Sequence, residues 1–145
     1  MQNAEEDYVR EVLGHIGLDL ARGNYTLCRP DGSAECEVDL VYTHKGCTFV
    51  IEVSANAQRD ARRRKRKAIG EWSDGDSFAR LSSALGLPAS NTLRAVYVDL
   101  SWHVEEGEDP TTINGGLVLG DAHMEELEAG PPERGLSVFL EWNGL

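Results

Sequence analysis

The 145-residue sequence lacks the long apolar runs and paired cysteines that would indicate a membrane protein or a disulfide-bonded secreted scaffold. No stretch approaches the roughly 20 consecutive apolar residues that cross a bilayer. The acidic start, residues 1–7, lacks the basic and then apolar order of a signal peptide. The three cysteines are odd in number and form no CxxC pair, which argues against a disulfide framework and a zinc ribbon. We therefore expect a cytoplasmic protein with no membrane partner.

Basic residues are also scarce, and they are unevenly placed. The net charge is -11, and seven of the 14 lysines and arginines lie in residues 59–67 with one acid. This stretch, RDARRRKRK, is called the basic segment; it carries +6, so the rest of the chain carries -17. The overall charge opposes binding to nucleic acid, but such asymmetry favours a localised anion-binding face. A solvated helix face or a partner-binding tract is the alternative.

Length and an apolar content of 41% indicate a single domain with one substantial core, spanning 1–145. Hydrophobic periodicity and turn residues predict helices at 4–16, 57–72, 77–85 and 121–127, with a surface loop at 105–116. They predict strands at 25–29, 35–43, 47–54, 93–100, 117–119 and 136–142. A helix between the third and fourth strands predicts a crossover to a parallel neighbour. We expect an α/β fold in which helices cover both faces of a mixed sheet.

Two acidic residues on consecutive predicted strands form the strongest chemical signal. If Lys45-Gly46 is a two-residue turn, opposed residues have numbers that sum to 91, so Asp39 faces Glu52. Like charges directly opposed on a hairpin are destabilising, and a divalent cation would resolve that conflict. Carboxylate oxygens suit Mg²⁺, which keeps several waters for a phosphate substrate. The alternative is a pair of unrelated carboxylates that point into solvent at a sheet edge.

The order of these residues resembles the PD-(D/E)XK nuclease superfamily, which includes restriction endonucleases and Mrr-like nucleases. The resemblance covers residues 4–100 and rests on Glu6 in the first helix, Asp39 in EVDLV and Glu52 in FVIEVS, followed by the basic segment. It implies one nuclease-like domain over 1–145, with a restriction-endonuclease-like three-layer α/β/α sandwich around a central mixed β-sheet. It also implies that Asp39 and Glu52 bind Mg²⁺ or Mn²⁺ and that Glu6, or in its place Glu5, is a third acid.

The resemblance departs from the family pattern at Ser54, where a lysine usually follows the strand glutamate by two positions. A serine cannot supply positive charge to the attacking water or to the developing charge on phosphate. Either a basic residue enters from elsewhere, with Arg64 or Lys65 expected on the inner side of their helix, or the domain binds without cutting. The phosphate-contacting residues would be Arg59, Arg62, Arg63, Arg64, Lys65, Arg66 and Lys67.

Three functions remain open from the sequence. The first is a metal-dependent endonuclease that hydrolyses DNA phosphodiester bonds in defence or repair, with Glu6, Asp39, Glu52, Ser54 and Lys65 at its active site. The second is an inactive nuclease-like domain that binds nucleic acid or a protein partner. The third is an unrelated α/β interaction protein. Many nucleases of this type cut both strands as homodimers, but no interface is legible in the sequence.

Overall fold

The computed structural model describes residues 4–55, 63, 64, 67, 70, 72 and 75–145. These residues form a six-stranded sheet with the order β1-β2-β3-β4-β6-β5. Its strands are β1 (Asp19–Cys28), β2 (Ala34–His44), β3 (Cys47–Ser54), β4 (Thr92–Asp99), β5 (Thr111–Ile113) and β6 (Gly116–Leu119). The helices with continuous described bounds are α1 (Ala4–His15), α3 (Gly75–Leu85), α4 (Asp121–Glu128) and α5 (Pro132–Trp142). The fold is therefore mixed α/β, as expected.

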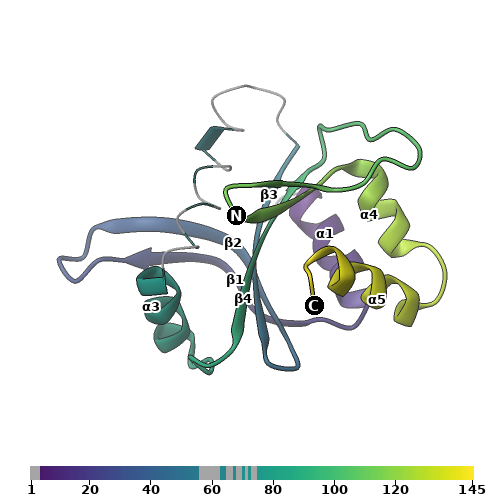
Figure 1. The fold of residues 1–145 in the computed structure, drawn as a ribbon. Coiled ribbons are helices and arrows are strands. Elements are labelled where there is room, and N and C mark those ends of the chain that lie inside the picture. Colours follow the sequence, from purple (N-terminus) through teal and green to yellow (C-terminus); the bar gives the residue numbers. More distant parts are fainter. Residues whose placement is uncertain (1–3, 56–62, 65–66, 68–69, 71, 73–74) are drawn as a thin grey trace.

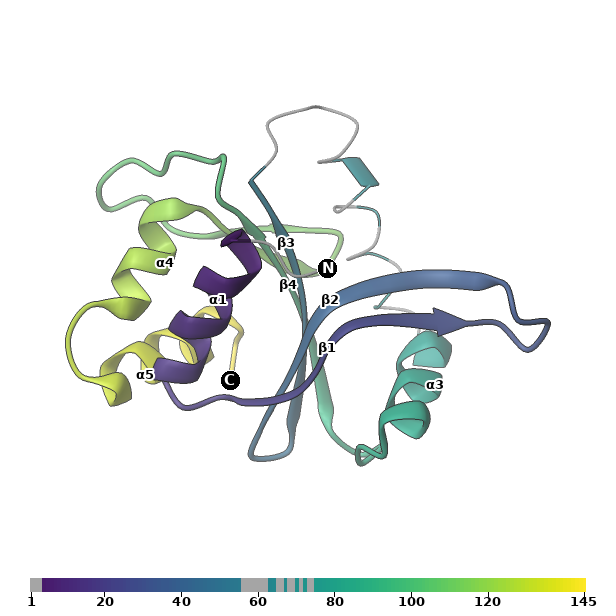
Figure 2. The same ribbon diagram turned by 180° about the vertical axis from the view of Figure 1, so that it is seen from behind.

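Helices lie on both sides of the sheet. In Figures 1 and 2, α1, α4 and α5 lie together on one side and α3 lies on the other. The larger core fills the space between the sheet and the group α1, α4 and α5. Val9, Val12 and Ile16, in or just after α1, are buried in this core. The predicted apolar face of the first helix is thereby confirmed. Among the described residues, no helix combines the length and the apolar character of a membrane span.

A second core lies on the α3 side and contains Leu27, Val38, Val41, Val50, Trp72 and Leu81. Strict alternation along β2 would put Val38 and Leu40 on one face, but Val38 belongs to this second core and Leu40 to the larger one. The β1–β2 hairpin extends away from the other strands towards α3 in both views. The pairing of β1 with β2 carries register shifts near both ends of β1, and such irregularities increase local twist.

The β2–β3 hairpin forms as its turn residues predict. Lys45 and Gly46 have φ values of 40° and 80°. Positive φ at both central residues is the signature of a two-residue type I′ turn, whose twist matches that of the flanking strands. The paired residues run from His44↔Cys47 to Leu40↔Ile51, so their numbers sum to 91. The next strand, β4, pairs with β3 in parallel, which confirms the predicted crossover.

The C-terminal third differs from the sequence prediction in two places. Residues 136–142, predicted as a strand, belong to helix α5, which has prolines at its start. Gly135, Phe139 and Asn143 are buried at intervals of four, a helical spacing that the β-branched and aromatic residues between them obscure. The second difference is that the predicted loop at 105–116 contains strand β5, which pairs with β6.

Candidate functional site

Asp39 lies at the point where the β2–β3 ladder ends. The last paired residues are Leu40 and Ile51, and Asp39 and Glu52 are one step further along the same register. The Oδ2 atom of Asp39 accepts the backbone N–H of Val53 at 2.8 Å. The side chain of Asp39 therefore provides an acceptor where the ladder gives none, and it is held beside the residue that follows Glu52.

Four polar side chains are buried on the ends of β3 and β4. Glu52 is paired with Tyr97, and Ser54 is paired with Asp99. Their exposed fractions are 2% for Glu52, 8% for Ser54, 0% for Tyr97 and 1% for Asp99. The neighbours of these residues along both strands belong to the larger core, namely Ile51, Val53, Val96 and Val98. Because side chains alternate along a strand, the side chains of the four polar residues point to the other face of the sheet, opposite the larger core. They are called the buried polar row.

The sequence prediction included Glu52 and Ser54 but missed Tyr97 and Asp99. Asp99 is held by the loop that follows β4, because its Oδ1 atom accepts the N–H of Ser101 at 3.1 Å and the hydroxyl of Ser101 at 2.5 Å. A signal for both residues was present in the sequence. Tyr97 and Asp99 alternate with apolar residues in LRAVYVDL, which predicts that they share one face of the strand, but their alignment with Glu52 and Ser54 follows only from the parallel register.

Glu6 is the third acid that the nuclease resemblance implies, and its place in the site stays a prediction. Its carboxylate is buried at the start of α1, with 5% exposure. Among the residues with described coordinates, no group of three histidine, cysteine, aspartate or glutamate side chains could hold a metal ion. Helix α1 packs on the sheet face that carries Ile51 and Val53, whereas alternation directs Glu52 to the other face.

The basic segment is only partly described. Arg63, Arg64 and Lys67 are helical and exposed, and their phosphate-contacting role stays a prediction. The exposure of Arg64 does not support its expected place on the buried side of its helix, where Trp72 is fully covered. Arg59, Arg62, Lys65 and Arg66 lie outside the described residues, so the expectation that Lys65 enters the site stays a prediction.

The donor set at the strand ends suits a hard divalent cation. Asp39 and Glu52 offer carboxylate oxygens from neighbouring strands, and the backbone of Val53 fixes the Asp39 carboxylate. Mg²⁺ is commonly bound through one or two carboxylates and keeps water as its remaining ligands. Two protein ligands are therefore sufficient for this ion.

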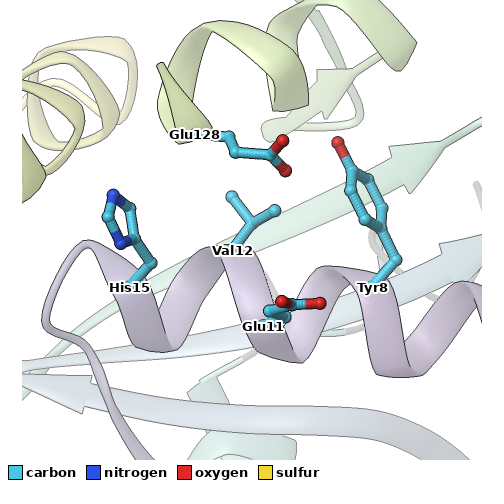
Figure 3. Close-up of a pocket in the computed structure, with 5 residues that line it drawn as sticks. All are labelled: Tyr8, Glu11, Val12, His15 and Glu128. Atoms are coloured by element: carbon cyan, nitrogen blue, oxygen red, sulfur yellow. The ribbon is translucent and has the colours of Figure 1, made fainter. Parts of the chain in front are cut away.

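A separate groove lies between α1 and α4. It has a volume of about 430 Å³ and is lined by Tyr8, Glu11, Val12, His15 and Glu128. Figure 3 shows the phenol of Tyr8 pointing towards the carboxylate of Glu128 across the groove. Burial, the negative charge of Glu128 and a hydrogen bond with it raise the pKa of Tyr8 to about 12. The groove is acidic and lies on the helical side of the sheet that α1 covers, away from the face of the buried polar row.

The buried polar row, Asp39 and the described basic residues thus make up the candidate site. Comparison with models of known protein families and with curated proteins gave no match for this chain.

Proposed function

We propose that this protein is a nuclease of restriction-endonuclease-like fold, dependent on Mg²⁺ or Mn²⁺, that hydrolyses DNA phosphodiester bonds. The observation that carries the proposal is the contact of Asp39 Oδ2 with the Val53 N–H, which holds one carboxylate beside the strand position of Glu52. The element order supports it as well, because a helix, a three-stranded meander and a crossover to a parallel strand are what the nuclease resemblance implies.

Each group has a defined task in the proposed reaction. Asp39 and Glu52 would hold the cation, which when bound lowers the pKa of a water molecule and orients the phosphate. The backbone of Val53 keeps Asp39 in place before substrate arrives, so little reorganisation is needed. Exposed Arg63, Arg64 and Lys67 would contact phosphates, which gives affinity that falls with salt concentration and carries no base specificity.

The proposal is tested by cleavage of supercoiled plasmid and of single-stranded DNA with Mg²⁺ or Mn²⁺. Loss of an outer-shell partner costs a metal site up to about 100-fold. Because Asp39 and Glu52 are proposed as direct ligands, we expect D39N and E52Q each to lower the rate by at least that factor. E37Q is the matched control, because Glu37 is an exposed carboxylate on the same strand and two positions from Asp39. Equal cleavage by wild type and D39N would show that the assigned site is wrong.

Metal binding gives a second measurement that does not depend on cleavage. A cation that binds only the folded protein at ten times its Kd stabilises it by about 1.4 kcal/mol. For a chain of this size that raises the melting temperature by about 3 to 6 °C. The increase should occur in wild type and E37Q and should disappear in D39N. A shift of the same size in D39N would place the cation elsewhere.

A nuclease-like domain that binds nucleic acid without cutting is the second candidate. Ser54 favours it, because this serine occupies the position of the usual lysine and is nearly buried. This function predicts salt-dependent binding that weakens when Arg63, Arg64 and Lys67 are changed to glutamine, with no cleavage by wild type under either metal. Cleavage that requires Asp39 would exclude it. Binding only to protein partners would exclude both nucleic-acid functions.

A further inference from the structure

Asp99 is a buried carboxylate that the proposed reaction does not yet use. It is the last residue of β4, and only 1% of it is exposed. The donors of Ser101 fix the direction of its carboxylate through Oδ1. It lies at the same end of the sheet as Glu52, on the strand next to it.

Parallel pairing places Asp99 next to Ser54. Neighbouring strands lie about 4.8 Å apart, and residues paired in parallel direct their side chains to the same face. The two strands do not separate at this point, because the N–H of Leu100 donates to the carbonyl oxygen of Ser54 at 2.8 Å. A nearly buried hydroxyl and a buried carboxylate therefore lie side by side, two positions beyond Glu52 on β3.

We propose that Asp99 is a positioning residue that orients the hydroxyl of Ser54 towards the attacking water, so that Ser54 and Asp99 together occupy the functional position of the usual lysine. This inference rests on the proposed nuclease function. Ser54 would be the catalytic residue of the pair, because its Oγ atom would touch the reacting water. Asp99 acts through Ser54 by accepting the hydrogen bond that the serine hydroxyl donates.

The hydrolytic step balances with this pair. The water oxygen forms a bond to phosphorus, and the bond between phosphorus and the leaving oxygen breaks. One proton of the water passes to Ser54 Oγ while the hydroxyl proton of Ser54 passes to the Asp99 carboxylate. The leaving oxygen takes a proton from solvent, and Asp99 later returns its proton to solvent. A serine alone would lack an acceptor of this basicity, which is the chemical reason for a carboxylate at the paired position.

The experiment is a double-mutant cycle on the metal-loaded protein with DNA. We expect S54A and D99N each to lower kcat by about 10- to 100-fold with little change in KM, a loss typical of groups that orient a catalytic ligand. The double variant S54A/D99N should be no slower than S54A, because Asp99 has no further role once the hydroxyl is gone. Losses that multiply in the double variant would overturn the inference.

A second pair of variants covers the case in which D99N fails to fold. Threonine keeps the hydroxyl, so the kcat of S54T should exceed that of S54A. It should reach at least about a tenth of the wild-type kcat, because a displaced outer-shell group costs about 10-fold. Equal rates for S54T and S54A would overturn the inference. Cleavage that requires Asp39 but is unchanged in D99N would overturn this inference alone. Absence of cleavage by wild type would overturn the proposed function together with it.

Discussion

Replacement of Asp39 separates its structural role from its proposed role at a cation. Alanine removes the acceptor of the Val53 N–H, which is a partly buried hydrogen bond to a charged group. Such bonds contribute about 1.5 to 3 kcal/mol. For a chain of this length, D39A should therefore lower the melting temperature by about 3 to 12 °C without any cation.

Asparagine at the same position gives a different outcome. Its side-chain oxygen can still accept the Val53 N–H, but the charge that strengthens the bond is gone, so we expect a loss of about 1 kcal/mol. D39N should thus stay close to wild type in stability while it loses the response to Mg²⁺. D39A therefore tests the hydrogen bond to Val53 through stability without a cation, and D39N tests cation binding through the melting response to Mg²⁺.

The assay is urea unfolding followed by circular dichroism, with thermal melts in chelator and in Mg²⁺. E37A is the control for D39A, since Glu37 is exposed on the same strand and its removal should change stability by less than about 0.5 kcal/mol. If D39A unfolded at the same urea concentration as wild type in chelator, the contact with Val53 would not exist in solution. The placement of the carboxylate beside Glu52 would then lose its basis.

Three further predictions concern the side of the sheet that α1, α4 and α5 cover. G135A should destabilise the protein by about 1 to 3 kcal/mol in urea unfolding, because the added Cβ would lie 2.4 Å from the carbonyl oxygen of Leu127. G14A is the control and should not destabilise the protein, because its added Cβ meets nothing within 4 Å. Equal stability of the two variants would contradict the packing at Gly135. H123A should lower the melting temperature by at least about 4 °C, because two hydrogen bonds of the buried imidazole are lost. Its Nδ1 atom accepts the N–H of Gly120 at 3.0 Å, and its Nε2 atom contacts the carbonyl oxygen of Glu108 at 2.8 Å. An unchanged melting temperature would show that these bonds do not form. Ultraviolet titration should find the phenol of Tyr8 near pH 12, and E128Q should lower the pKa of Tyr8 towards 10.0, because burial and the charge of Glu128 raise it. Since this pKa is raised in the folded state, the stability it contributes is present below pH 10 and lost as pH rises towards 12.

Local patterns in the sequence were sufficient for the elements nearest the candidate site. The boundaries of β3 match the prediction at both ends, and those of α1, β2 and β4 differ from it by at most one residue at each end. The prediction missed residues 19–24 of β1. It failed at β5 and α5 because both depend on distant contacts. The three residues of β5 are stabilised by pairing with β6, and α5 approaches the chain at Leu127 through Gly135, which no local pattern reveals.

The approach of Asp39 to the strand of Glu52 was determined by the sequence itself. A two-residue turn fixes the register of a hairpin locally, so Lys45-Gly46 decides which residues of β2 and β3 are opposed. The partners of the other site residues were decided only by the tertiary structure. Asp99 lies beside Ser54 because a crossover of nearly 40 residues returns β4 parallel to β3, and α1, which carries Glu6, packs against the sheet face that carries Ile51 and Val53. Register across a crossover and the choice of sheet face depend on packing between segments that are distant along the chain, and a single sequence carries no local signal for either.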